Sequence, residues 1–315
     1  MKLLSVVIVS LFAFALTLGG MTLSYDSQQY VQAAQVWRET GIIPASYGSW
    51  TPLYPMLLGF SSDPISAARW LNVICYAIST WIALSFIQPQ QPKAQLALVI
   101  ALILSPALTL VHQLVWSEPL FITLTLTVLA LAPSAGRRWL LLALVVALAC
   151  VQRYTGILLI PIGVLALVLD RAAWYKIGGF VAISVFPISL WALRNLQLGY
   201  AALGARSEAQ FTLYQSAQFG TLTLAGWILT FGIALWVCRK TTVRLNRNVL
   251  LLSALYAAGH WGMTIYSGAT TGIDAPDNRL LSPIFIPLLL CTFAAAAYIS
   301  KWNAQASAPM LAKKA

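Results

Sequence analysis

The chain has 315 residues, of which 60% are hydrophobic and only 9% are charged, and its mean hydropathy is +0.80. About a quarter of the residues of a typical soluble domain are charged. The much lower charged fraction here excludes a soluble globular protein and indicates a polytopic membrane protein. The net charge of +11 does not point to nucleic acid, because basic residues of membrane proteins gather in cytoplasmic segments. The four cysteines lie in apolar stretches without CxxC spacing, which indicates buried thiols and neither disulfides nor a zinc site.

Apolar runs separated by polar residues predict an all-α fold of about ten transmembrane helices. The runs cover residues 3–23, 65–87, 95–111, 119–132, 139–151, 155–169, 177–193, 219–238, 248–266 and 280–299. The fifth run is too short to cross a bilayer of about 30 Å, so runs five and six are expected to form a hairpin whose tip lies below the outer surface. The first run follows Lys2 as in a signal peptide, but it is long and no cleavage site follows, so we expect an uncleaved anchor.

The distribution of charge predicts the orientation in the membrane. If the N-terminus is cytoplasmic, most of the 19 basic residues lie on the cytoplasmic side of the membrane. Of the eight acidic residues, Asp170 alone lies on that side. We therefore expect one transmembrane domain, 1–315, with cytoplasmic termini, outer segments at 24–64 and 194–218, and a cytoplasmic tail at 301–315. The candidate chemistry then lies on the outer face.

Asp26 follows the first span, and a carboxylate at the mouth of a membrane-embedded cavity can take a proton from a substrate hydroxyl. Apolar side chains recur at helical spacing from Tyr30 to Trp37 and Gly41 ends the pattern, which predicts an amphipathic helix at the interface. Residues 26–29, Asp-Ser-Gln-Gln, also have the spacing of a capping box. Asp26 is therefore a candidate base and, alternatively, the N-cap of this helix.

Six short segments occupy the predicted outer side. They are the Asp26 loop with Tyr30 and Gly41, Pro52-Leu53-Tyr54-Pro55, Trp116-Ser117-Glu118-Pro119-Leu120-Phe121, Arg153-Tyr154-Thr155-Gly156, Trp191-Ala192-Leu193-Arg194-Asn195, and Asp277-Asn278-Arg279-Leu280-Leu281-Ser282-Pro283. Together they resemble the GT-C superfamily of integral-membrane glycosyltransferases, in particular its family 39-like and aminoarabinose-transferase-like members. The resemblance extends over nearly the whole chain. It departs from these families at Ser27, where members often carry a second acid, and we expect a short form without their soluble C-terminal domain.

Such enzymes transfer a sugar from a polyprenyl-phosphate carrier to an acceptor at the outer face of the membrane, usually with inversion. The resemblance therefore implies a hexosyl or pentosyl transferase of the bacterial inner membrane, with a lipid, glycan or protein acceptor and no nucleic-acid partner. It also implies that Asp26 is the catalytic residue that takes the proton of the acceptor hydroxyl.

The remaining site residues follow from the chemistry of a departing lipid phosphate, which needs fixed cations in a dry pocket. Arg153, Arg194 and Arg279 lie at outer span ends and are expected to bind that phosphate; anchoring to lipid headgroups is the alternative. The expected substrate-binding residues are Tyr30, Tyr54, Glu118 and Asp277. Glu118 could instead only complement a helix dipole, and Tyr54 could be an interfacial anchor.

Two isolated histidines, His112 and His260, have no partner at ligand spacing, so a divalent metal is weakly supported and no cofactor is expected. A transporter or flippase of lipid-linked glycans and an O-antigen polymerase-like enzyme are the alternative functions. A transporter should place charges along the membrane midplane and break helices in both halves. Here the charges collect at one face and no repeat is visible, which favours the transferase.

Overall fold

The computed structural model describes residues 2–204, 208–239, 243, 245–272 and 274–312, and for 300–312 it describes the backbone alone. These residues form helices, with an isolated bridge between Thr22 and Leu114. The helices are α1 (Lys2–Ala15), α2 (Tyr25–Thr40), η1 (Ala45–Tyr47), α3 (Leu53–Gly59), α4 (Pro64–Ser85), α5 (Pro92–Leu104), α6 (Pro106–Gln113), α7 (Glu118–Leu131), η2 (Ala132–Ser134), α8 (Trp139–Gln152), η3 (Tyr154–Leu158), α9 (Leu159–Leu169), α10 (Trp174–Gln197), α11 (Leu213–Gly226), α12 (Ile228–Cys238), α13 (Arg247–Thr270), α14 (Asn278–Leu281), η4 (Ser282–Ile284) and α15 (Phe285–Ala312).

Each of the ten predicted runs contains one helix or two or three consecutive helices, so the chain is an all-α polytopic membrane protein, as predicted. In the described part, five helical segments are long and apolar enough to cross a membrane: α4, α10, α11 with α12, α13, and α14 with α15. A sixth is the pair α5 and α6, bent by 54°. The bend follows from Pro106, which cannot donate a helical hydrogen bond and instead starts α6 behind the Ser105 cap. Shorter apolar helices account for the other four runs.

The short fifth and sixth runs form the predicted hairpin. Helix α8 ends at Gln152, Arg153 is extended, and the chain re-enters through η3. Gly156 makes this turn possible, because a Cβ there would lie 2.2 Å from the carbonyl oxygen of Ala149. The hairpin presents Arg153 at its tip.

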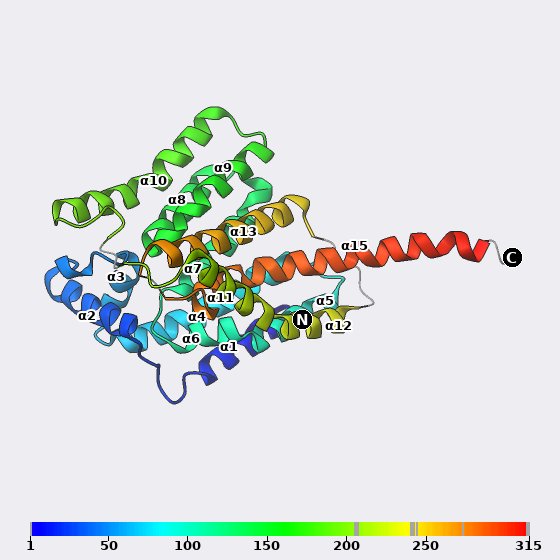
Figure 1. The fold of residues 1–315 in the computed structure, drawn as a ribbon, viewed down its shortest axis with the longest axis horizontal. Coiled ribbons are helices and arrows are strands. Elements are labelled where there is room, and N and C mark those ends of the chain that lie inside the picture. Colours follow the sequence, from blue (N-terminus) through cyan, green and yellow to red (C-terminus); the bar gives the residue numbers. More distant parts are fainter. Residues whose placement is uncertain (1, 205–207, 240–242, 244, 273, 313–315) are drawn as a thin grey trace.

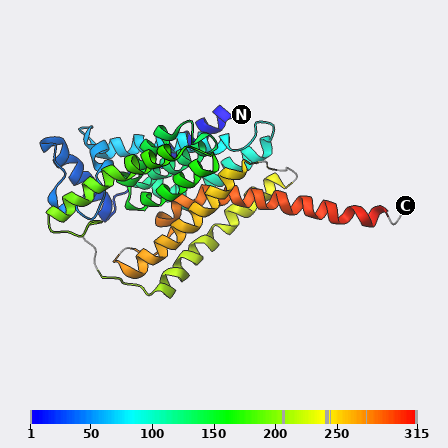
Figure 2. The same ribbon diagram turned by 90° about the horizontal axis from the view of Figure 1, so that it is seen from above.

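The elements that will form the site lie at one end of the molecule. In Figures 1 and 2, α2 and α3 occupy this end, while the last turns of α15 extend beyond the bundle in the opposite direction. Helix α2 packs on α3 and α4, and α14 packs on α6 and α13. Strong packing of α8 against α10 and of α1 against α4 holds the bundle beneath them.

The predicted orientation can be tested by thiol labelling in a chain whose four native cysteines are replaced by alanine. Cysteines at Gln28 and Gln210, both exposed, are expected to react with a membrane-impermeant reagent added outside intact cells. A cysteine at the exposed Gln90, in the turn between α4 and α5, should react only after permeabilisation. Labelling of the cysteine at position 90 from outside, or protection of the cysteine at position 28, would contradict the predicted orientation.

Candidate active site

Four charged side chains from four distant parts of the sequence meet at the α2 end of the molecule. The Glu118 Oε1 atom lies 2.6 Å from Arg153 Nη1 and 2.7 Å from Arg279 Nε. Arg279 also donates through Nη2 to Asp26 Oδ2. We call these four residues, Asp26, Glu118, Arg153 and Arg279, the charge cluster.

The charge cluster is electrically balanced and largely buried. Glu118 is fully buried and Arg279 is 7% exposed, whereas the Asp26 side chain keeps 22% of its surface. Buried charges are tolerated only when paired, and here two carboxylates compensate two guanidinium groups. Asp274 lies 3.6 Å from Arg279 but is mostly exposed, so it adds little. Asp26 is thus the carboxylate of the cluster that a substrate can most readily reach.

Asp26 is not the N-cap of α2, so that alternative interpretation is wrong. The cap is Ser24, which is extended and accepts a hydrogen bond from the Ser27 amide at 3.3 Å. The helix therefore begins two residues earlier than the Asp-Ser-Gln-Gln pattern suggests. Ser24 is held in this position because its Oγ also accepts a hydrogen bond from the indole N–H of Trp116 at 2.7 Å. Asp26 therefore lies in the first turn, and its carboxylate is available to Arg279. The predicted end of the helix is confirmed by Gly41, whose φ is 71°.

Ser117 and Trp116, the two residues before Glu118, belong to the site although no role is predicted for them from the sequence. Ser117 is buried; its Oγ accepts from Arg153 Nη1 at 2.8 Å and lies 3.2 Å from the Tyr30 hydroxyl. Trp116 lies under Arg279, with the guanidinium carbon 4.2 Å from the ring centroid, a cation–π contact. Their position directly before a glutamate at a predicted outer span end was the available signal.

Three tyrosines pack beside the charge cluster. The ring of Tyr30 lies edge-on to Tyr54 at 4.9 Å and to Tyr47 at 6.3 Å. Burial raises the pKa of Tyr30 to about 12, so its hydroxyl stays protonated at neutral pH. The buried hydroxyls of Tyr47 and Tyr54 have no hydrogen-bond partner among the described residues. Such groups are costly to leave unpaired, which marks this corner as a place where a polar ligand would be favourable.

Arg194 contacts the first outer loop rather than the charge cluster. Its Nη2 atom donates to the carbonyl oxygens of Ile43 and Pro44 at 2.9 and 2.7 Å, and its guanidinium stacks on Trp191 at 4.2 Å. The predicted phosphate ligands are therefore divided: Arg153 and Arg279 lie together, and Arg194 holds the chain that follows α2.

The hydrogen bonds of Tyr154 fix the same loop. Its hydroxyl donates to the carbonyl oxygen of Gly48 at 3.2 Å and accepts from Trp191 Nε1 at 3.0 Å and Asn195 Nδ2 at 3.2 Å. The segments around Arg153 and Arg194 thus meet through these side chains. They position the loop that packs against Tyr30.

Asp277 is the N-cap of α14. Its Oδ1 atom accepts from the amides of Arg279 and Leu280 at 2.9 and 3.0 Å, and burial raises the pKa of its carboxyl. The carboxylate thereby sets the position of the short helix that carries Arg279.

The two histidines are engaged with the protein backbone. His112 Nδ1 lies 2.7 Å from the Leu108 carbonyl oxygen, and His260 Nε2 lies 2.9 Å from that of Leu280. Among the described residues, no three His, Cys, Asp or Glu side chains gather as they would around a metal ion.

Solved structures show which fold this is. The crystal structure of ArnT from Cupriavidus metallidurans in the apo state aligns with a TM-score of 0.65 at 13% identity. The structure of the same enzyme bound to undecaprenyl phosphate aligns with a TM-score of 0.60 at 15% identity. Both alignments cover 93% of this chain and 59% of the ArnT chain, so this chain spans less than two thirds of the length of the proteins it matches. No protein-family model and no curated protein sequence matches it. The chain therefore shares the transmembrane fold of ArnT, in agreement with the fold that the resemblance of its six outer segments implied.

Proposed function

We propose that this protein transfers a sugar from a polyprenyl-phosphate-linked donor to an acceptor hydroxyl. The charge cluster carries this proposal: a partly exposed carboxylate, Asp26, lies against the buried guanidinium group of Arg279 at one end of a GT-C-like fold. A member of that fold, ArnT, has been crystallised with undecaprenyl phosphate. A base next to fixed cations is what the reaction requires, since a proton leaves the acceptor while negative charge grows on the departing phosphate.

In this proposal Arg279 and Arg153 bind the donor phosphate. Glu118 accepts from both guanidinium groups and holds them in fixed positions, so no reorganisation is needed when the phosphate leaves. The acceptor oxygen attacks the anomeric carbon, and the bond from that carbon to the phosphate oxygen breaks with its electron pair going to the phosphate. Asp26 takes the acceptor proton, and attack from the side opposite the phosphate inverts the anomeric centre.

The pairing of Asp26 with Arg279 determines the order in which the two substrates bind. Without a substrate, Arg279 forms close ion pairs with two carboxylates, Asp26 and Glu118. A donor phosphate competes with Asp26 for Nη2, because Glu118 is buried and also tied to Arg153. Donor binding therefore releases Asp26 to act as base, and the acceptor reacts second.

We place this site at the outer face of a bacterial inner membrane, with both termini in the cytoplasm. The charge distribution of the sequence supports this orientation. The acceptor is a lipid, glycan or protein, and the transferred sugar is a hexose or pentose.

Removal of either phosphate-binding guanidinium tests the proposal. Arg279→Ala and Arg153→Ala are each expected to lower sugar transfer by about 30- to 900-fold, which corresponds to about 2–4 kcal/mol of lost transition-state stabilisation. Undecaprenyl phosphate binding, measured with radiolabelled lipid in nanodiscs, should fall in parallel. Arg38→Ala is the matched control, since Arg38 is exposed on the last turn of α2. Normal binding and transfer in both cluster variants would contradict the proposal.

A further inference from the structure

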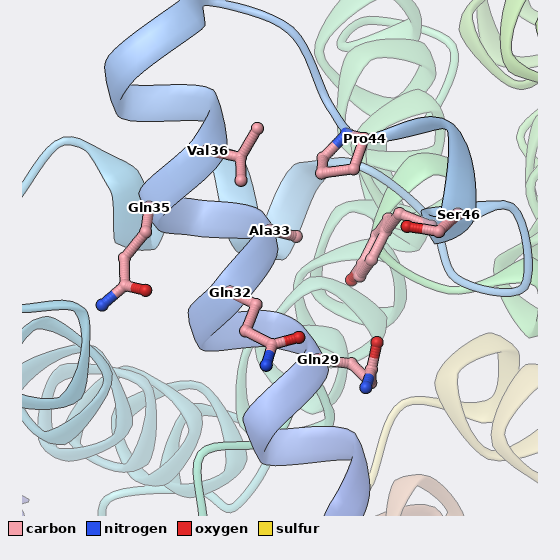
Figure 3. A pocket seen from close by; sticks show the side chains of 8 residues that line it. Gln29, Gln32, Ala33, Gln35, Val36, Pro44 and Ser46 are labelled. Atoms are coloured by element: carbon pink, nitrogen blue, oxygen red, sulfur yellow. The ribbon is translucent and has the colours of Figure 1, made fainter.

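A hollow of about 290 Å³ lies between α2 and the segment that follows it. Figure 3 shows Gln29, Gln32 and Val36 along one side of α2, facing Pro44 and Ser46 across the hollow. Asp26 precedes Gln29 by three residues, so both lie on one face of the helix. The hollow therefore begins about one helical turn after Asp26 and follows α2 toward Val36.

The lining of the hollow is uncharged and combines amide and hydroxyl groups with apolar side chains. Gln29, Gln32 and Gln35 contribute amides and Ser46 a hydroxyl, and none of the described lining residues carries a charge. Amides and hydroxyls both donate and accept hydrogen bonds, which matches sugar hydroxyl groups. A phosphate would need lysine or arginine. The guanidinium groups of Arg153 and Arg279 are held in the charge cluster, and that of Arg194 is engaged by the carbonyl oxygens of Ile43 and Pro44. The two parts of the site thus differ in the ligand chemistry they suit.

Tyr47 connects the hollow with the charge cluster. It lines the hollow, is 2% exposed, and its hydroxyl has no hydrogen-bond partner among the described residues. Its ring lies edge-on to that of Tyr30 at 6.3 Å, and the Tyr30 hydroxyl lies 3.2 Å from Ser117 Oγ, which accepts a hydrogen bond from Arg153. The unpaired hydroxyl of a residue that lines the hollow is a group that a ligand hydroxyl would satisfy.

We propose that this hollow binds the acceptor, and that the bound part of the acceptor is a neutral glycan. The inference rests on the proposed function and adds to it the chemical class of the second substrate. Donor phosphate is held by Arg153 and Arg279, and the acceptor lies along α2 with one hydroxyl directed at Asp26. A phosphorylated acceptor group is disfavoured in the hollow because nothing in its lining would neutralise the charge.

The test uses two photoreactive probes on the full chain in nanodiscs. One is an alkyl disaccharide carrying a benzophenone, and the other is the same molecule with a phosphate monoester on the sugar. The neutral probe is expected to label the peptide that contains residues 29–47, and Gln29→Ala with Gln32→Ala should reduce this labelling about tenfold, since two hydrogen bonds are lost. Gln28→Ala, an exposed glutamine of α2 outside the hollow, should leave labelling unchanged. Gln32→Lys should increase labelling by the phosphorylated probe.

Undecaprenyl phosphate binding is measured on the same samples and reports the donor site separately. Labelling as expected without donor binding would overturn the proposed function and keep a neutral-glycan site. Donor binding with equal or stronger labelling of the wild-type hollow by the phosphorylated probe would overturn this inference alone. Labelling by the neutral probe outside residues 29–47, or equal effects of Gln28→Ala and the paired variant, would overturn it as well.

Discussion

Asp26→Asn is expected to lower sugar transfer by about 10²- to 10⁴-fold, the range over which general-base catalysis contributes. The variant should still fold, because Ser24 and not Asp26 caps α2. Undecaprenyl phosphate should bind more tightly than in the wild type, since Arg279 loses the carboxylate that competes with the phosphate. The opposite signs of the two effects distinguish loss of a base from loss of structure. Both are measured in nanodiscs at equal amounts of folded protein.

Asp63→Asn provides the matched control for this experiment. Asp63 is an exposed N-cap at the start of α4 that accepts from the amides of Ile65 and Ser66 at 3.1 and 3.2 Å. Asparagine caps a helix about as well as aspartate, so transfer and binding should both remain at wild-type levels. Near-normal transfer by Asp26→Asn would remove Asp26 from the mechanism. Weaker lipid binding by that variant would contradict the competition for Arg279.

Glu118→Gln is expected to cost about 3–5 kcal/mol of stability, the usual range when one partner of a buried ion pair is removed. Glutamine keeps the shape of the side chain but removes the carboxylate that pairs with both Arg153 and Arg279. The expected readout is a lower midpoint of thermal unfolding in nanodiscs. Glu39→Gln, an exposed position on α2, should not change that midpoint.

A second variant separates charge compensation from simple packing at Glu118. Adding Arg153→Gln to Glu118→Gln removes the surplus positive charge, so the double variant should be more stable than Glu118→Gln alone. The loss of stability is measured for Glu118→Gln, for Arg153→Gln and for the double variant. If the loss in the double variant equals the sum of the two single losses, or if Glu118→Gln unfolds like the wild type, Glu118 does not compensate the charge of the two guanidinium groups.

The sequence by itself determined the fold class and most of the helices. The apolar runs are long and the polar segments between them are short, so hydrophobicity alone predicts where the helices lie. The interfacial pattern between Tyr30 and Trp37 and the stop at Gly41 likewise predicted α2, because both signals are local. The start of α2 was missed by two residues, since Ser24 and Asp26 are both good caps and the choice depends on the Trp116 indole N–H that reaches Ser24.

The tertiary structure alone decided which of the predicted site residues meet. Arg153, Arg194 and Arg279 have the same local signature, an arginine at the outer end of an apolar run. The fold directs Arg194 to backbone carbonyls of the first loop and brings Arg279 to Asp26, 253 positions earlier in the chain. Ser117 and Trp116 also acquire their roles only when α2, α8 and α14 assemble around the start of α7. Such contacts depend on how helices pack in three dimensions, and no periodicity or capping motif along the chain encodes them.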